Sequence, residues 1–278
     1  EMSASLVGSE MCIRDRPSDV YYGSGAYFQN CLLGVCEPAS LLGYNVLITT
    51  SNVHDISELQ SLVESNRVDG MLLTRALEDD RALQYLSQVN FPTALTGTCR
   101  YDNIIQVDTD NEGAAEKMTT LLIGKGFRRF AFLVKNMSYN VDRKRHEGFC
   151  RALIKNGISE KDQLFYNGSI RMEFLDAIIE NIISKKVECI ICGDDEICTM
   201  VMSRLQAEGY RIPKDVAIAS LYNSTNLDCY SPAVTAVSVA ASQMGGAAVR
   251  QLIQRLRGEN YEKKTMLDYD ILFRKSTN

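Results

Sequence analysis

The stretch CIICGDDEIC (189–198) joins an apolar run to three acidic residues at the start of a helix-length segment. Residues 187–192 are short, apolar and bounded by polar positions, which predicts a buried strand. Residues 195–207 have the length and periodicity of an amphipathic helix ending before Gly209. In open α/β sheets, ligands bind beyond the carboxyl ends of strands, so Asp194 and Asp195 are candidate site residues.

The cysteines of this stretch are a weaker candidate. Residues three apart on a strand point to opposite faces, so Cys189 and Cys192 are badly placed to share a metal ion. A thioredoxin-like CxxC motif has its first cysteine at a helix N-terminus, where the pKa of the thiol is lowered. The chain has only two histidines, His54 and His146. We expect buried thiols, with no metal and no cofactor.

The two aspartates leave two interpretations open. One of them could cap the following helix, because carboxylates accept hydrogen bonds from the first amides of a helix. Both could instead bind a ligand at the mouth of a cleft. A two-metal catalytic site is disfavoured, because no further carboxylate cluster has suitable spacing.

Outward from this stretch, short β-rich runs alternate with helix-length segments along the chain. This alternation predicts an α/β fold with two doubly wound parallel sheets, each covered by helices on both faces. We expect Asn111 to cap a helix over 112–125 and a single last strand over 267–273. The predicted strands lie at 45–50, 70–74, 92–96, 103–107, 130–134, 163–166, 187–192, 216–220 and 267–273, and the helices at 27–42, 57–65, 79–89, 112–125, 143–156, 173–184, 195–207 and 241–257.

Composition narrows the class of protein. The 278 residues carry a net charge of −5, which argues against a free-standing nucleic-acid binder. Nine cysteines without a tight framework suit a reducing compartment. No apolar run approaches the length of a membrane span, and the N-terminus lacks the pattern of a signal peptide. We therefore expect a cytoplasmic protein with no membrane partner.

Several stretches, in order, resemble the LacI/GalR family of transcriptional repressors. They include RVDGMLL (67–73), RKRHEGFCRALIKNG (143–157) and CYSPAVTAVSV (229–239), together with 26–48, 110–133 and 189–220. FRKST (273–277) resembles the closing R-x-S strand of that family. The resemblance implies two lobes of the periplasmic-binding-protein type, joined by three crossovers around a cleft. The lobes would be 18–108 with 241–268, and 109–240 with 269–278.

The resemblance also assigns ligand-binding roles. Tyr27 and Phe28 match an aromatic position that lines the cleft, although they could equally be core residues at a helix start. Arg145 matches an arginine that binds ligand hydroxyls or carboxylate, a task that suits a guanidinium with its fixed donors. Asp194 stands where the family has asparagine, with Asp195 beside it. Tyr222, followed by Asn223, stands where the family has an aspartate, which leaves the identity of the ligand open.

Two further departures concern the N-terminus. The resemblance implies a preceding helix-turn-helix, which this sequence does not supply, so the chain as given is not expected to bind operator DNA. The first strand of the N-terminal lobe is also expected to be missing. Residues 1–17 do not resemble family sequence, and SASLV (3–7) is the candidate to replace that strand.

The favoured function is the ligand-sensing core of a transcriptional repressor. It would bind a small polar metabolite, a sugar or a nucleoside-like molecule, and control DNA binding through the conformation of a homodimer. The alternative is a solute-binding protein of a sugar transporter, which shares the fold but is exported. An enzyme is not expected, because no nucleophile–base pair, P-loop or dinucleotide-binding motif is present.

Overall fold

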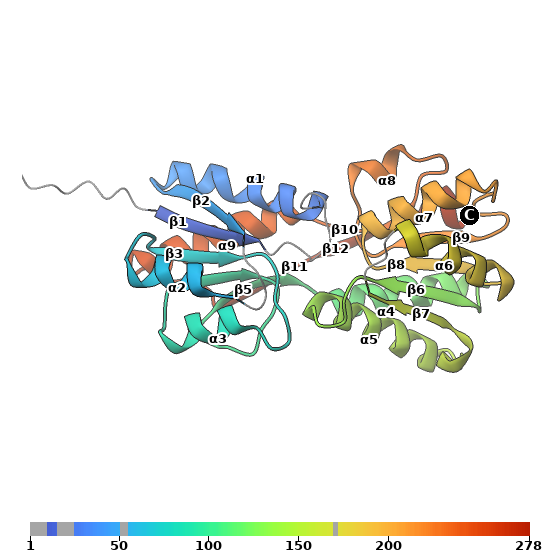
Figure 1. Ribbon diagram of the computed structural model, residues 1–278, viewed down its shortest axis with the longest axis horizontal. Helices are drawn as coiled ribbons and strands as arrows, with labels where there is room; N and C mark the ends of the chain where they lie inside the picture. The colour runs from blue at the N-terminus through green and yellow to red at the C-terminus, as the bar shows by residue number, and fades with distance from the viewer. Residues whose placement is uncertain (1–9, 16–24, 51–54, 169–171) are drawn as a thin grey trace, which may run out of the picture. The chain divides into compact units, whose positions relative to one another are not determined.

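The structure is a computed structural model that describes residues 10–15, 25–50, 55–168 and 172–278 (Figure 1). The chain divides into two compact units. Unit 1 comprises residues up to Asp108 together with Ala240–Leu267, and unit 2 comprises Thr109–Val239 and Asp268–Asn278. Each unit is an α/β layer structure around one six-stranded, mostly parallel sheet, which confirms the predicted fold class.

Unit 1 has the strand order β11-β5-β4-β3-β1-β2. Helices α1 and α9 pack on one face of this sheet and α2 and α3 on the other, so apolar residues are buried on both faces. The strands are β1 (Glu10–Asp15), β2 (Asn45–Thr50), β3 (Gly70–Leu73), β4 (Thr93–Thr96), β5 (Ile105–Thr109) and β11 (Lys264–Leu267), and the helices are α1 (Ala26–Leu41), α2 (Ser57–Glu64), α3 (Arg81–Gln88) and α9 (Ala241–Leu256).

Strand β1 corrects the expectation that the first strand of this unit is missing. It lies between β2 and β3 and pairs in parallel with both, with Met11 opposite Val46 and Gly70. Met11 and Cys12 are fully buried on opposite faces of the sheet. The segment SASLV, which was the candidate replacement, lies outside the described residues. Residues 10–15 therefore fill the place between β2 and β3 despite their charged composition.

Unit 2 has the strand order β12-β10-β9-β8-β6-β7. In the described part of this sheet, β10 and β12 pair antiparallel and the other neighbouring strands pair in parallel. Helices α4 and α5 cover one face and α6, α7 and α8 the other. The strands are β6 (Phe130–Val134), β7 (Leu164–Asn167), β8 (Cys189–Cys192), β9 (Ala217–Ser220), β10 (Thr235–Val239) and β12 (Tyr269–Leu272). The helices are α4 (Asn111–Gly124), α5 (Asn140–Lys155), α6 (Met172–Ser184), α7 (Asp195–Ala207) and α8 (Thr225–Cys229), with 3₁₀ turns at Glu160–Asp162 and Lys275–Thr277.

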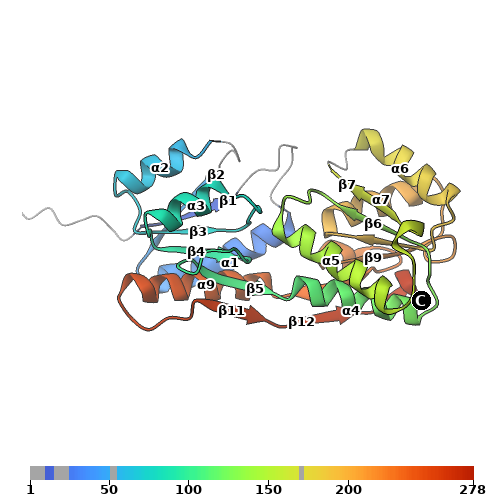
Figure 2. The same ribbon diagram turned by 90° about the horizontal axis from the view of Figure 1, so that it is seen from below.

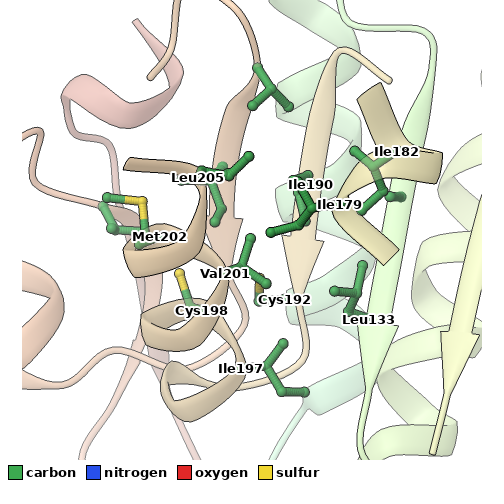
Figure 3. Packing of buried hydrophobic residues seen from close by; sticks show 14 of the residues in the cluster. Leu133, Ile179, Ile182, Ile190, Cys192, Ile197, Cys198, Val201, Met202 and Leu205 are labelled. Carbon is green, nitrogen blue, oxygen red and sulfur yellow. The ribbon is translucent and has the colours of Figure 1, made fainter. Parts of the chain in front are cut away.

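In strand β8 the two cysteines of the CxxC spacing point into different cores. Its side chains alternate, so Cys189 belongs to the core under α4 and α5, while Cys192 belongs to the core under α6 and α7. Figure 3 shows Cys192 among Leu133, Val201 and Ile197 in the second of these cores. Burial raises the pKa of both thiols. The prediction that the two cysteines face opposite ways is confirmed.

Three local features differ from what the sequence predicts. Asp110, not Asn111, caps α4, and its carboxylate accepts a hydrogen bond from the Gly113 amide at 2.8 Å. The strand expected over 267–273 is present as the shorter β12, whereas β11, which directly precedes it and pairs in unit 1, was not expected. The FRKST stretch ends the chain in a 3₁₀ turn, not a strand. Ser276 is fully buried there and donates to the Ile218 carbonyl at 2.6 Å.

Candidate functional site

The candidate site lies at the carboxyl edge of the unit 2 sheet, where β6 and β8 end and α5 and α7 begin. Because β6 and β8 are parallel and adjacent, the residues that follow them emerge at the same edge. Lys135 follows β6, and Gly193 and Asp194 follow β8. These positions bring charged side chains together beside the first turns of two helices.

Asp194 is held by two neighbours. It is the N-cap of α7, where its Oδ1 accepts a hydrogen bond from the Ile197 amide at 2.9 Å. Its Oδ2 lies 2.7 Å from the Lys135 Nζ. Burial acts to raise the pKa of Asp194, but Lys135 and the Ile197 amide outweigh it and hold the pKa below its ordinary value. The capping interpretation is thus confirmed for Asp194, which is ionised at neutral pH.

Lys135 is the cation that the sequence analysis missed. Its side chain is 26% exposed and also forms an ion pair with Glu196 in the first turn of α7. Burial acts to lower the pKa of Lys135, yet the two carboxylates raise it overall. The rule that selected Asp194, a polar residue directly after a buried strand, applies equally to Lys135 after β6.

Arg145 is fixed in the interior of the site. Its Nη1 donates to the Gly193 carbonyl at 2.6 Å, and its Nε donates to Asn111 Oδ1 at 3.1 Å. The close approach of α5 to α4 makes the second contact possible. A Cβ at Gly148 would lie 2.1 Å from the Glu112 carbonyl oxygen, so only glycine permits this helix spacing. The arginine therefore connects the end of β8 to the start of α4.

Asp142 lies one helical turn before Arg145 and was also missed. It is 7% exposed, and its Oδ2 accepts a hydrogen bond from the Asn136 amide at 3.0 Å. Burial raises the pKa of Asp142 to about 6, although Arg145 opposes the shift. Residues three apart on a helix share a face, which is the signal that could have placed Asp142 beside Arg145.

Asp195 is the other buried carboxyl group at this edge. Burial raises its pKa, the nearby Ser224 hydroxyl acts in the opposite direction, and the neighbouring Asp194 raises the pKa further. Arg145, Asp194 and Asp195 are thus brought into one charged cluster with Lys135 and Asp142. The cluster offers both carboxylate acceptors and cationic donors, which suits a small ligand rich in hydroxyl groups.

The loop after β9 holds Tyr222 and Asn223. Tyr222 is only 3% exposed, and its backbone exchanges hydrogen bonds with the Ser220 hydroxyl. Asn223 Oδ1 accepts a hydrogen bond from Arg274 Nη1 at 2.9 Å, and the same nitrogen donates to the Val234 carbonyl. Asn223 therefore anchors the C-terminal R-x-S segment as well as being a candidate ligand residue.

Tyr27 and Phe28 lie in unit 1, in the first turn of α1. Phe28 is 7% exposed within the core under α1 and α9, and Tyr27 lies at the margin of that core with its hydroxyl 3.8 Å from the Met244 sulfur. Phe28 has the burial of a core aromatic, and Tyr27 is the more accessible of the two. A ligand-binding role for either stays a prediction, as it does for the five residues of unit 2.

The described residues contain no group of three or more His, Cys, Asp and Glu side chains arranged to hold a metal ion. Within the same described ranges, no helix has both the length and the apolar character needed to cross a bilayer.

Comparison with known proteins places this geometry in a family. Residues 119–277, more than half of the chain, match the periplasmic binding protein-like domain. The chain belongs to that family. The regulator CelR of Thermobifida fusca is 26% identical over 257 residues, which cover 90% of this chain and 76% of the relative. A structure described as transcriptional regulator LacI from Bacillus cereus subsp. cytotoxis NVH 391-98 has a TM-score of 0.87 at 26% identity and covers 96% of this chain and 98% of its own.

A complex of transcriptional regulator CelR with cellobiose shares the fold, with a TM-score of 0.85 at 24% identity over 96% of this chain and 84% of its own. These relatives are transcriptional regulators and not enzymes. The resemblance to the LacI/GalR family is confirmed, and the chain is an effector-binding core of the LacI type. In this effector-binding core the charged cluster of unit 2 is the candidate site, and Lys135 and Asp142 join the residues predicted from sequence.

Proposed function

We propose that this effector-binding core senses a small polar metabolite through the charged cluster at the carboxyl edge of unit 2. Arg145, Asp194 and Asp195 would contact the ligand, with Lys135 and Asp142 as neighbours that set their charge. The observation that carries the proposal is the position of Arg145, which is bound to the carbonyl that follows β8 and lies near the carboxyl groups of Asp142 and Asp194. Tyr27, Phe28, Tyr222 and Asn223 are further candidates on the resemblance alone.

The ligand class we favour is a neutral polyol such as a sugar, with a nucleoside-like molecule as the alternative. Lys135 is already paired with Asp194 and Glu196, and Arg145 lies near the carboxyl groups of Asp142 and Asp194, so acidic groups outnumber cations in the cluster, which disfavours an anionic ligand. Hydroxyl groups can donate to carboxylates and accept from a guanidinium, which matches the groups present. The cellobiose complex of a regulator with this fold makes a disaccharide the first candidate to test.

The test is calorimetric titration of the chain with cellobiose, other sugars and nucleosides. Asp195→Asn keeps the shape of the side chain but removes its charge, so we expect affinity for the bound compound to fall at least about tenfold. Glu180→Gln, an exposed acid on α6, is the matched control and should change nothing. Unchanged affinity in Asp195→Asn, beside a bound ligand, would contradict this site.

We further propose that the core acts as a homodimer and that the effector shifts the dimer between states with different affinity for operator DNA. Couplings of this kind are typically 1–3 kcal/mol, or roughly 5- to 150-fold in affinity. The proposal is supported by the regulators to which the chain is similar. Sedimentation at high micromolar concentration is expected to give a dimer, and a strict monomer would count against it.

A further inference from the structure

A hollow of about 960 Å³ lies at the amino edge of the unit 2 sheet, at the opposite end of the strands from the charged cluster. It is formed by the segments that follow α4, α6 and α7 and by residues directly before β6, β8 and β9. Its volume is at the upper end of the range typical of ligand pockets. None of its lining residues belongs to the candidate effector site.

The hollow combines an apolar wall with an excess of positive charge. The wall comprises Phe127, Ile183, Val187, Tyr210 and Pro213. Five cationic and three acidic side chains also line it, in a chain whose net charge is −5. Each of the three acids already has an arginine partner, in the pairs Arg129–Glu188, Arg211–Asp215 and Arg204–Glu208.

Lys186 and Lys214 are exposed, and neither ammonium group makes a hydrogen bond or salt bridge to any part of the chain that the structure describes. Cations are common near helix C-termini because they oppose the helix dipole. Arg128 and Arg129 serve that role directly, by donating to the Ile123 carbonyl at 2.7 Å and the Lys186 carbonyl at 2.6 Å. The two lysines make no such contact, so helix capping does not account for them.

We propose that this hollow docks a short acidic peptide segment of a protein partner. Carboxylates of the segment would pair with Lys186 and Lys214, and one apolar side chain would pack against Phe127 and Tyr210. Recognition of acidic motifs by clustered cations is a recurring mode of peptide binding. A nucleic acid fits less well, because Glu188, Glu208 and Asp215 interrupt the positive surface and would repel a continuous phosphate backbone. The inference does not depend on the proposed effector function.

The experiment measures fluorescence anisotropy of a labelled peptide with six glutamates around a central phenylalanine, titrated with the full chain. We expect saturable binding that weakens as salt is raised, because the rim charges are exposed. The double variant Lys186→Glu with Lys214→Glu should weaken binding at least about tenfold. The matched control, Lys161→Glu with Lys263→Glu, changes two exposed lysines outside the hollow and shifts the net charge equally, so it should change affinity less than about twofold.

A peptide with glutamine in place of glutamate tests the charge requirement and is expected not to bind. Three results would overturn the proposal: no saturable binding below about 1 mM, an equal loss in both double variants, or tighter binding of a single-stranded oligonucleotide of the same charge. Effector titrations on the same variants keep this test separate from the effector proposal, because the hollow and the charged cluster share no residue.

Discussion

The helix pairs α1–α9 in unit 1 and α4–α5 in unit 2 both pack through a glycine that touches a backbone carbonyl of the partner helix, but their surroundings differ. Figure 2 shows each pair packed side by side. In unit 1, a Cβ at Gly34 would lie 2.0 Å from the Ser242 carbonyl oxygen, and one at Gly245 would lie 2.2 Å from that of Cys31. In unit 2, Gly148 meets the Glu112 carbonyl in the same way. In both pairs, the contact between a glycine and a backbone carbonyl of the other helix sets the spacing of the helices.

The pairs differ in what surrounds that contact. The α1–α9 pair belongs to an apolar core, and no ion pair joins these two helices within the described residues. The α4–α5 pair adds ion pairs of Arg151 with Glu112 and Glu116 and of Lys155 with Glu116. It also carries Arg145 and its partner Asn111. The glycine contact therefore sets the distance between the paired helices in both units. In unit 2, the same helix pair also carries a polar site.

The largest expected effect comes from filling the glycine contacts. Gly34→Ala and Gly148→Ala each place a methyl group on a backbone carbonyl, so the helices must separate, at a cost of about 3 kcal/mol of unfolding free energy. Urea denaturation measures the loss, and hydrogen exchange should locate it at α1 and α9 for the first variant and at α4 and α5 for the second.

Gly124→Ala is the matched control for both variants. Gly124 ends α4, and nothing lies within 4 Å of a Cβ built on it. Alanine there should stabilise the chain by about 0.5–1 kcal/mol, because it restricts the unfolded state. A similar loss in all three variants would show that the glycines matter for the helix backbone and not for the spacing of the pairs.

The next prediction concerns the pH dependence of stability, which depends on the polar site of unit 2 and not on the glycine contact. The pKa of Asp142 is about 6 in the folded chain, above its ordinary value of 3.8, so the folded state binds the proton more tightly. Its contribution to stability is present below pH 4 and is lost as the pH rises to about 6. Asp142→Asn should remove this loss, which amounts to about 1 kcal/mol per pH unit. Denaturation midpoints between pH 4 and 7 measure it.

Asp194→Asn is the control of opposite sign. The pKa of Asp194 is below its ordinary value, so its contribution is present above pH 4 and is lost as the pH falls further. This variant should therefore alter the acid side of the profile and leave most of the fall between pH 4 and 6 in place, because burial contributes more than Asp194 to the raised pKa of Asp142. If Asp142→Asn left the profile unchanged, the carboxyl group would not be buried as the structure shows.

A third effect on stability concerns the hydrogen bonds of Ser276, which lies outside the helix pairs. Ser276 accepts a hydrogen bond from the Thr235 amide at 2.8 Å and donates to Ile218, so it ties the chain end to β9 and β10. Ser276→Ala leaves a buried amide and a carbonyl without this partner and should cost about 1–3 kcal/mol in thermal unfolding. Ser184→Ala, which removes an exposed hydroxyl contact on α6, should stay within about 0.5 kcal/mol.

Sequence patterns predicted the elements whose local signals are strong. The bounds expected for the helix at 195–207 match those of α7, because an N-cap acid and a following glycine limit it on both sides. Strand β1 was missed because EMCIRD carries three charges and resembles no buried strand. Its place depends on pairing with β2 and β3, which are distant in sequence. Strand β11 was missed for the same reason.

The site was less accessible to sequence reasoning than the fold. Asp194, Asp195 and Arg145 follow from position and resemblance, but the partners that set their charge are Lys135, directly after β6, and Asp142, in the first turn of α5. Arg145→Ala is a weaker test of binding, because it would also disturb the unliganded fold. Removal of the buried guanidinium would take away the donor to Asn111 Oδ1 and to the Gly193 carbonyl, together with a positive charge near Asp142. Asp195→Asn is therefore the sharper test of binding.

The smallest effect concerns the ion pairs that distinguish α4–α5 from α1–α9. Lys155 is 61% exposed and lies 2.5 Å from Glu116, whose pKa is lowered mainly by its hydrogen bond with Lys155. Lys155→Ala should cost less than about 0.5 kcal/mol, and the cost should vanish in 1 M salt, because exposed pairs are screened. Lys161→Ala removes an exposed lysine that forms no ion pair with the described residues, and so corrects for the change in net charge. A cost above 1 kcal/mol that persists in salt would mean that charge, and not only Gly148, holds α5 against α4.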